Sequence, residues 1–254
     1  MSDTVLETSE IERYARHIVL PEVGGSGQQA LKRASVLIIG AGGLGSPVAL
    51  YLAAAGVGRI GIADDDTVSL SNLQRQVIHA APDIGRPKLD SAGERIAALN
   101  PHVRFTPHLV RIDAENGPAI VKDYDLVIDG SDNFTTRYLM ADLCEAAKVP
   151  LVTAAVQRFS GSLTVLAPHQ SDADGRPNPR YRDLFPEAPP PGVVPSCAEA
   201  GILGTTTGVL GTLAANEALK LICGIGEPLI GKLLMVDLLA MRFETIRYKR
   251  PKTE

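Results

Sequence analysis

Short apolar runs alternate with longer amphipathic stretches through the first 150 residues, which is the pattern of strands alternating with helices. Apolar, β-branched runs predict strands over residues 35–39, 59–63, 103–109 and 125–129. Helical patterns fall between them, over residues 44–55, 88–99 and 114–121. Strands separated by helices predict a parallel sheet covered on both faces, so this region is expected to form a Rossmann-like, doubly wound α/β fold.

The flanking segments follow other patterns. Residues 10–19 predict a helix that exposes Arg13 and Arg16, and residues 24–27 predict a glycine-rich turn before a short helix that ends at Lys32. After a helix over residues 135–148, alternating runs predict two hairpins, formed by 151–156 with 162–167 and by 232–238 with 242–248. We therefore expect the mostly parallel sheet to be extended by antiparallel strands in the C-terminal half.

A long connection, residues 168–196, separates these two hairpins. It carries eight prolines and almost no periodic apolar pattern. Connections longer than about 12–15 residues inside a compact domain are usually functional or disordered. A lid or a loop that clamps a substrate tail is one reading, and a surface insertion is the other.

Composition limits the class of protein. With 254 residues and 45% apolar content, the chain fits one large α/β domain over 1–254, with a nucleotide-binding half (33–150) and a second half (151–254). A net charge of -4 and a pI near 5.8 give no reason to expect nucleic-acid binding, which usually requires an excess of basic residues. Glycines interrupt the longer apolar stretches and the N-terminus is polar and acidic, so we expect no membrane segment, no signal peptide and a cytoplasmic protein.

The cysteines number three and are scattered, without a CxxC pair, which argues against a disulfide framework and structural zinc. Cys144 and Cys223 lie in apolar helical patterns, where a small buried hydrophobe is expected. Cys197 differs because it follows the proline-rich connection and precedes a glycine-rich helix start. A thiol in such a place is a candidate for chemistry.

A glycine loop follows the first strand. Gly40, Gly42 and Gly45 fit the GxGxxG pattern, in which the backbone approaches a phosphate at a helix N-terminus. Asp64 closes the second strand, where an acidic side chain accepts hydrogen bonds from a ribose diol. For Asp65 and Asp66 we expect a solvated turn. These features alone suit either a dinucleotide or ATP.

Cationic residues beyond the second strand favour ATP. Backbone amides often serve the internal pyrophosphate of a dinucleotide, whereas a free triphosphate carries more charge and favours added cations and a divalent metal. Arg75 and Lys88 are placed to supply that charge. Asp132 follows the fourth strand, which in a doubly wound sheet opens into the same crevice, so we expect it to bind magnesium.

The order of these motifs resembles the MoeB/ThiF family, the bacterial relatives of ubiquitin-activating enzymes. The resemblance covers nearly the whole chain and rests on six motifs: RYAR (13–16), GAGGLG (40–45), DDDTVSLSNLQRQ (64–76), GRPK (85–88), NP (100–101) and DGSDN (129–133). Members adenylate the C-terminal glycine of a small ubiquitin-like sulfur-carrier protein, MoaD- or ThiS-like and ending in Gly-Gly. The activated carrier serves molybdopterin, thiamin or related sulfur transfer.

The resemblance implies roles for individual residues. Gly43 would present its amide to ATP, Asp64 would hold the ribose, and Asp132 would bind magnesium. Arg16 would reach into the ATP site of a neighbouring subunit, which implies a homodimer. The phosphate and nucleotide contacts would come from Ser71, Asn72, Arg75, Gln76, Lys88 and Asn133.

Two departures from the family stand out. Many members carry two zinc-binding CxxC pairs; here Arg180-Tyr-Arg-Asp183 stands in place of the first, and the second is absent beyond Tyr248. We therefore expect no zinc. The chain carries no rhodanese-like domain, so a separate protein would donate sulfur. For Cys197 two roles remain possible: a covalent reaction with the carrier, or packing that anchors the loop.

Three alternatives share parts of the pattern. An NAD(P)-dependent oxidoreductase would use the glycine loop and Asp64 but gives no reason for Arg75, Lys88 and Asp132. A catalytically silent partner subunit would lack some phosphate contacts, and none is missing here. Relatives that activate a carboxylate on tRNA share the first step, although the acidic pI makes them less attractive.

Overall fold

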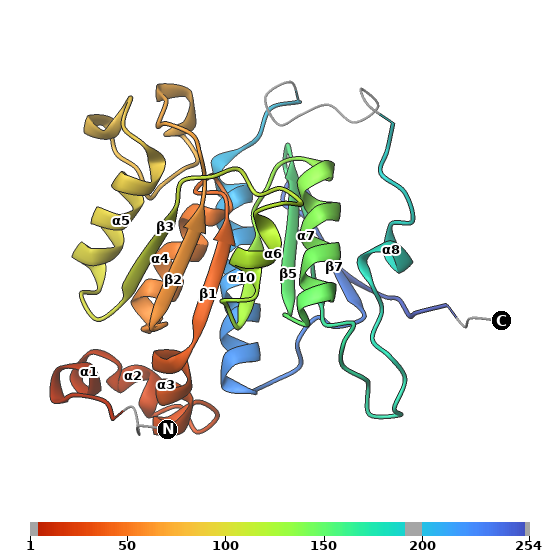
Figure 1. Ribbon diagram of the computed structural model, residues 1–254, viewed down its shortest axis with the longest axis horizontal. Helices are drawn as coiled ribbons and strands as arrows, with labels where there is room; N and C mark the ends of the chain where they lie inside the picture. Colours follow the sequence, from red (N-terminus) through yellow and green to blue (C-terminus); the bar gives the residue numbers. More distant parts are fainter. Residues whose placement is uncertain (1–4, 191–199, 252–254) are drawn as a thin grey trace.

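The computed structural model describes residues 5–190 and 200–251, and a single mixed sheet runs through this part of the chain (Figure 1). Its strand order is β3-β2-β1-β4-β5-β6-β7-β8. The first five strands pair in parallel, and the β5–β6, β6–β7 and β7–β8 pairs are antiparallel. The strands are β1 (Ser35–Ile39), β2 (Arg59–Ala63), β3 (Arg104–His108), β4 (Leu126–Asp129), β5 (Leu151–Gln157), β6 (Ser160–Leu166), β7 (Lys232–Asp237) and β8 (Arg242–Arg247).

Helices cover both faces of the sheet and one end of it. The described helices are α1 (Thr8–Arg13), α2 (Ala15–Ile18), α3 (Gly24–Arg33), α4 (Gly45–Ala55), α5 (Lys88–Leu99), α6 (Gly117–Val121), α7 (Phe134–Ala147), α8 (Tyr181–Leu184) and α10 (Gly204–Cys223). Two short 3₁₀ helices, η1 (Leu70–Asn72) and η2 (Ala81–Asp83), lie between β2 and α5. Figure 1 shows α1–α3 together at the end of the sheet where β1 begins.

Strand β1 is buried on both faces, and its alternating side chains serve two cores. Val36 and Ile38 pack with α4, α5 and α10, whereas Leu37 and Ile39 pack with α6, α7 and α8. All four are at most 5% exposed. Continuous apolar runs are typical of parallel strands covered on both sides, which is why the sequence predicted this strand well.

The predicted fold class is confirmed. Strand β4 pairs with β1, so the strand order reverses between them, and the chain beyond each opens into the same crevice. The bounds of β1, β2 and α5 agree with the prediction residue for residue. The two predicted hairpins extend the sheet as antiparallel strands, with β5 and β6 joined through Arg158 and Phe159.

Two predictions about the N-terminal region were wrong. The helix expected over residues 10–19 is divided at Tyr14, whose buried hydroxyl accepts a hydrogen bond from Asn100 Nδ2 at 2.7 Å. The glycine-rich turn expected at residues 24–27 is the first turn of α3. Gly27 lies beside the end of α10, where a side chain on it would be at contact distance, 3.5 Å, from Cys223 Sγ. Tertiary packing here overrides the low helix propensity of glycine.

The connection expected to be irregular over residues 168–196 is described as far as residue 190, and part of it is ordered against α7. Tyr181 is 4% exposed and packs on Tyr138 with ring centroids 5.0 Å apart. Arg180 pairs with Glu145 at 2.8 Å, and Arg182 pairs with Asp142 at 2.7 Å. Helix α8 thus anchors this part of the connection on the outer face of α7.

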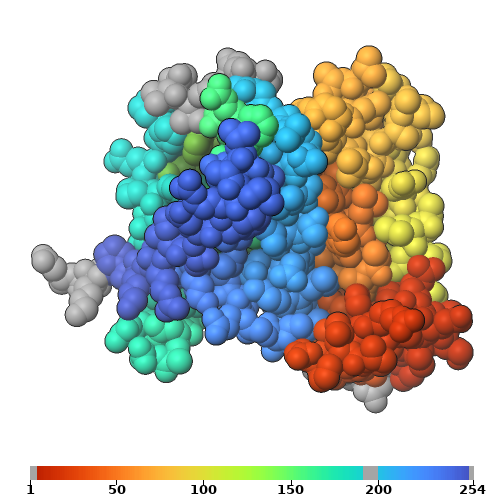
Figure 2. Space-filling view, turned by 180° about the vertical axis from the view of Figure 1, so that it is seen from behind, coloured from red at the N-terminus to blue at the C-terminus, as the bar shows by residue number. Residues whose placement is uncertain are grey.

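Helix α10 links the two halves of the sheet. It packs on α3 and α4 and also on β5 and β6. Figure 2 shows it at the surface between the C-terminal strands and the helices of the N-terminal half. Among the described residues no helix, α10 included, combines the length and the apolar content that a membrane crossing requires.

Candidate functional site

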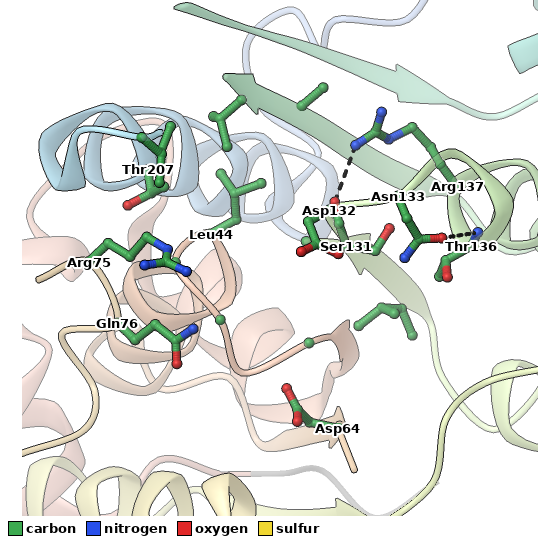
Figure 3. A pocket seen from close by; sticks show the side chains of 18 of the residues that line it. Leu44, Asp64, Arg75, Gln76, Ser131, Asp132, Asn133, Thr136, Arg137 and Thr207 are labelled. Atoms are coloured by element: carbon green, nitrogen blue, oxygen red, sulfur yellow. Dashed lines mark hydrogen bonds between the residues drawn. The ribbon is translucent and has the colours of Figure 1, made fainter. Parts of the chain in front are cut away.

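The carboxyl ends of β1, β2 and β4 meet at a cavity of about 850 Å³ (Figure 3). Its wall brings together most of the residues singled out from the sequence. They come from the glycine loop, the end of β2, the segment before α5, the start of α5 and the loop after β4. Those lining the cavity are Gly40, Gly42, Gly43, Asp64, Asn72, Arg75, Gln76, Lys88, Asp132 and Asn133.

The glycine loop is tightly packed at its base. A side chain at Gly45 would lie 1.9 Å from the Gly40 carbonyl oxygen, so only glycine lets α4 start this close to the end of β1. A side chain at Gly43 would meet Thr207 of α10 at 2.9 Å, so glycine lets the loop pass this close to α10, and Gly43 also lines the cavity. The loop therefore presents main chain and the start of α4, an arrangement suited to phosphate.

Asp64 is held in place by backbone donors. Its Oδ2 accepts a hydrogen bond from the Ala41 N–H at 2.7 Å, and its Oδ1 accepts one from the Asp66 N–H at 2.8 Å. The residue is 9% exposed and lines the cavity. Its carboxylate thus ties the end of β2 to the glycine loop at the wall of the cavity.

Lys88 begins α5 and is only 5% exposed. Its Nζ lies 2.7 Å from Asp66 Oδ2 and 3.7 Å from Asp64 Oδ2. Asp66 is 68% exposed, as expected for a solvated turn, and it also pairs with Lys88. A buried ammonium needs such partners, since desolvation without them is costly.

The segment around η1 forms the wall on the α4 side (Figure 3). Arg75 Nη1 donates to the Ser71 carbonyl at 3.1 Å, which folds its guanidinium back over its own turn. Gln76 Nε2 donates to Asn72 Oδ1 at 3.2 Å, and Gln76 Oε1 is buried without a hydrogen-bond partner among the described residues. An orphaned acceptor on a cavity wall is a place where a ligand donor gains a bond.

Ser71 is not brought to the cavity. Its side chain is exposed, and its Oγ lies 3.1 Å from Ser69 Oγ. It is not among the described residues that line the cavity, whereas its neighbours Asn72 and Arg75 are.

The opposite wall contains a residue that the sequence reasoning missed. Arg137, in the first turn of α7, is 7% exposed and donates from Nη2 to the Ser131 carbonyl at 3.2 Å. Its Nε lies 3.8 Å from Asp129 Oδ2 and has no hydrogen bond within the described chain. Asn133 caps the same helix, accepting from the Thr136 N–H at 2.8 Å. The signal was available: an arginine one turn into the helix that starts after Asp132.

The cavity also continues along the antiparallel strands. Ala155 of β5 and Gly161 and Ser162 of β6 contribute small side chains, and Met235 of β7 and Ile202 contribute apolar ones. No charged residue of β5, β6 or β7 lines this part in the described chain. This part of the wall is therefore uncharged and includes several small residues.

One predicted site residue lies away from the cavity, and another is not described. Arg16 is exposed on α2, at the end of the sheet where β1 begins, whereas the cavity lies where β1 ends (Figure 1). It therefore does not reach the cavity of its own chain. Cys197 lies outside the described residues.

The other cysteines are buried or half-buried. Cys144 is 2% exposed, and burial raises the pKa of its thiol far above its usual range. Burial also raises the pKa of Cys223, whose Sγ contacts the Gly27 carbonyl at 3.7 Å. Both thiols are therefore poor nucleophiles, as the apolar patterns around them predicted.

Comparison with known proteins agrees with this geometry. The model of the ThiF family matches residues 14–254. The sulfur carrier protein adenylyltransferase of Thermus thermophilus is 50% identical over 241 residues, covering 95% of this chain and 88% of that protein. The SAMP-activating enzyme E1 of Haloferax volcanii is 47% identical, covering 96% of this chain and 87% of that protein.

Other relatives are longer than this chain. The probable adenylyltransferase/sulfurtransferase MoeZ of Mycobacterium tuberculosis is 49% identical over 97% of this chain, which spans 62% of its length. Among solved structures, E. coli MccB superposes with a TM-score of 0.83 at 20% identity, covering 98% of this chain and 72% of MccB. At that identity the likeness supports the fold alone.

Proposed function

This chain belongs to the ThiF family, and from that membership we propose that it uses ATP to adenylate the C-terminal glycine of a small ubiquitin-like sulfur-carrier protein. The products are a carrier acyl-adenylate and pyrophosphate. The adenylate prepares the carrier for conversion to a thiocarboxylate, for molybdopterin, thiamin or related sulfur transfer. Relatives of this chain are named for activities of this kind.

One observation carries the proposal: a single cavity joins a phosphate-binding set to a small-residue groove. The glycine loop, Arg75 and Lys88 supply amides and cations at one end. Gly161 and Ser162 line the other end. A triphosphate fits the first, and an extended Gly-Gly tail fits the second. A dinucleotide would need neither the extra cations nor a groove for a peptide.

The reaction needs little acid–base chemistry. A C-terminal carboxylate, with a pKa of about 3.3–3.7, is ionised near neutral pH and attacks without a general base. Its oxygen forms a bond to the α-phosphorus while the bond from that phosphorus to the bridging oxygen breaks, and pyrophosphate leaves with the electron pair. The site must align these atoms and stabilise the charge on the transferring and leaving groups.

Residues of this chain are suited to those tasks. The loop amides and Lys88 would face the phosphates, Arg75 would turn from the Ser71 carbonyl toward them, and Asp64 would hold the ribose. Asn72, Gln76 and Asn133 would add polar contacts. Arg137 adds a further cation on the wall opposite Arg75, with its Nε making no hydrogen bond within the described chain.

Asp132 is the residue proposed to hold magnesium. Its carboxylate lines the cavity between the two cationic walls, and hard cations prefer carboxylate and phosphate oxygens. Bound there, the ion would offset phosphate charge. We expect the activity to require a divalent cation, with chelation abolishing it.

A homodimer would complete the site. Arg16 lies far from the cavity of its own chain, which supports a role in the site of a neighbouring subunit. The supply of ATP favours a cytoplasmic location. We expect Cys197→Ala to keep the adenylation step, because no step of adenylation uses a thiol.

Carrier-dependent ATP–pyrophosphate exchange tests the proposal. Candidate carriers that end in Gly-Gly are compared with the same proteins lacking the last glycine, with ATP and NAD binding measured in parallel. We expect exchange only with an intact tail, and tight binding of ATP but not NAD. Tight NAD binding with no exchange for any carrier would overturn the proposal in favour of an oxidoreductase.

A further inference from the structure

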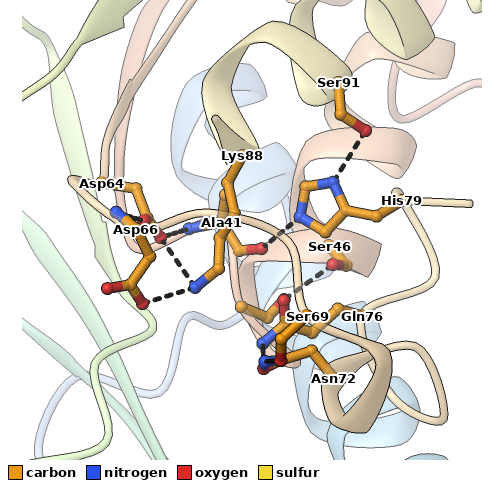
Figure 4. A network of polar contacts seen from close by, with 11 residues as sticks. Ala41, Ser46, Asp64, Asp66, Ser69, Asn72, Gln76, His79, Lys88 and Ser91 are labelled. Carbon is orange, nitrogen blue, oxygen red and sulfur yellow. Dashed lines mark hydrogen bonds and ion pairs between the residues drawn. The ribbon is translucent and has the colours of Figure 1, made fainter. Parts of the chain in front are cut away.

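A buried histidine supports the glycine loop from behind. His79 is 7% exposed and is not among the described residues that line the cavity. Its Nε2 lies 3.0 Å from the Ala41 carbonyl oxygen, and its Nδ1 lies 2.9 Å from Ser91 Oγ on α5 (Figure 4). The ring thus bridges the loop and α5 through both nitrogens.

Ala41 is held on both sides by these contacts. Its N–H donates to Asp64 Oδ2 at 2.7 Å, and its carbonyl faces His79. A trans peptide is planar and directs its C=O and its N–H to opposite sides. Because the carbonyl of the Ala41–Gly42 peptide points to His79, the Gly42 N–H points away from His79, and Gly42 lines the cavity.

We propose that His79 is a positioning residue, which fixes the glycine loop so that the Gly42 N–H faces the bound nucleotide. It touches no reacting atom and acts through the Ala41–Gly42 peptide. The identity of the ligand as ATP rests on the proposed function, whereas the orientation of the peptide rests on the hydrogen bonds alone.

The hydrogen bonds also determine which ring nitrogen carries the proton. A carbonyl oxygen only accepts, so Nε2 must be the protonated nitrogen that donates to Ala41. Burial lowers the pKa of His79, with Lys88 lowering it further and Asp83 and Asp64 opposing, so the ring is neutral near pH 7. Nδ1 is then bare and faces Ser91 Oγ, whose single hydroxyl proton is directed either to Nδ1 or to Asp83 Oδ2. The opposite tautomer would place a lone pair against the Ala41 oxygen.

Ser91 connects the ring to a second element. Its Oγ lies 2.8 Å from Asp83 Oδ2, and that same carboxylate oxygen accepts from the Ala80 N–H at 2.8 Å. The support for the glycine loop therefore runs from the loop through His79 and Ser91 to the η2 turn. The ring is thus held in place between the Ala41 carbonyl on one side and Ser91 Oγ on the other.

Two amide substitutions separate the proposed role from simple packing. Glutamine reaches as far as Nε2 and keeps a donor for Ala41, whereas asparagine reaches only the Nδ1 position and leaves the Ala41 carbonyl unpaired. We expect His79→Asn to raise the KM for ATP about tenfold, as a lost buried hydrogen bond implies, with a smaller change in kcat. His79→Gln should restore most of that loss.

The measurements are ATP binding by calorimetry, KM and kcat in the exchange assay, and the ¹⁵N shifts of His79 in the wild-type chain. The shifts should show a protonated Nε2 and a bare Nδ1. A protonated Nδ1 with a bare Nε2, or equal losses in the Asn and Gln variants, would overturn the positioning role while ATP binding stands. No ATP binding by the wild-type chain would overturn the proposed function and the role together.

Folding of the variants does not decide the outcome. Should His79→Asn fail to fold, the ¹⁵N shifts of the wild-type chain still test the tautomer, and Ser91→Ala weakens the support from the other side. Ser91→Ala keeps the Ala41 hydrogen bond, so we expect its KM for ATP to rise less than about threefold, below the effect of a full lost bond. A larger rise than in His79→Asn would contradict the assignment.

Discussion

The Nζ of Lys88 lies 2.7 Å from Asp66 Oδ2 and 3.7 Å from Asp64 Oδ2, so two carboxylates at the end of β2 share one buried ammonium. Under the proposed function Lys88 must exchange one of these partners for phosphate. Asp66 is the one available for exchange, because its side chain is 68% exposed whereas that of Asp64 is 7% exposed.

Removing the ammonium and removing its exposed partner should therefore have opposite effects. Lys88→Ala should lower the rate of ATP–pyrophosphate exchange at least about 100-fold, the typical loss of one preorganised charged donor. Asp66→Asn should lower the KM for ATP about two- to threefold, since an exposed ion pair is weak and competes with phosphate. Exchange kinetics on both variants measure this, and full activity in both Lys88→Ala and Arg75→Ala would remove the phosphate assignments.

The groove along β5–β7 should be separable from the nucleotide site. Ser162 lines it from β6, opposite Ala155 in the strand register. A bulky side chain there, in Ser162→Phe, should reduce carrier-dependent exchange at least about tenfold, because a tail that no longer aligns loses the benefit of proximity. ATP binding by calorimetry should stay within about twofold of wild type, within the usual effect of a distant substitution.

Ser162→Ala is the matched control for that experiment. It removes the hydroxyl without adding volume, so a similar loss in both variants would show that the hydroxyl, not the space, matters. Loss of ATP binding in Ser162→Phe would show instead that the groove and the nucleotide site are one.

The α8 anchor should contribute strongly to stability. Tyr181 packs between Tyr138 and Phe185, with ring centroids at 5.0 and 5.2 Å, and burial raises its pKa to about 12. Tyr181→Ala should lower the free energy of unfolding by about 3–5 kcal/mol, the usual cost of deleting a buried aromatic ring. Urea unfolding measures this.

Arg176→Ala is the comparison on the same connection. Its ion pair with Asp174 is exposed, at 63% and 67% of the side chains, so the change in stability should be under about 1 kcal/mol. Equal effects of the two substitutions would contradict an anchoring role for Tyr181.

Stability should fall as the pH drops below neutrality. Burial lowers the pKa of His79, His108 and His169 in the folded chain. Between the ordinary value, near 6.5, and these lowered values the unfolded chain binds more protons than the folded one. The free energy of unfolding therefore decreases as pH falls through this window, by up to about 1.4 kcal/mol per pH unit for each histidine.

Urea unfolding between pH 7.5 and 5.5 measures how steeply the free energy of unfolding changes with pH. This range lies above the pH at which Glu10 and Asp83, whose pKa values are lowered, take up protons. His79→Gln should flatten the pH dependence, because glutamine does not titrate. A slope that is unchanged in the variant, or stability that rises on acidification, would contradict the prediction.

The sequence predicted best where the chain is apolar and periodic. Strands β1 and β2 have the continuous β-branched runs of doubly covered strands, and Lys88–Leu99 has a clear helical period, so their bounds were found from the pattern. It failed at Gly24–Gly27, where the first turn of a helix is built from residues of low helix propensity. Helix propensity is a weak guide there because tertiary packing can override it.

The site was predictable to the extent that its residues belong to motifs. Gly40, Asp64 and Lys88 were found because they follow strands or begin a helix, and the topology then brings them together. Arg137 was missed because an arginine in a helical pattern is usually solvated, and only the packing of α7 against β4 buries it. The role proposed for His79 likewise depends on its hydrogen-bonding contacts with Ala41 and Ser91, which the sequence does not reveal.

Strand β5 is parallel to β4 on one edge and antiparallel to β6 on the other. It therefore separates the parallel part of the sheet, which carries the glycine loop, from the antiparallel part, which carries the groove. In the parallel part, hydrogen bonds and ion pairs connect the glycine loop, Lys88 and Asp64, so a substitution there alters the proposed ATP site. The hairpin of β7 and β8 lies beyond them, with Met241, Phe243 and Ile246 open at the surface. Under the proposed function, substitutions in the β7–β8 hairpin could change which carrier protein binds without changing the residues proposed to bind ATP.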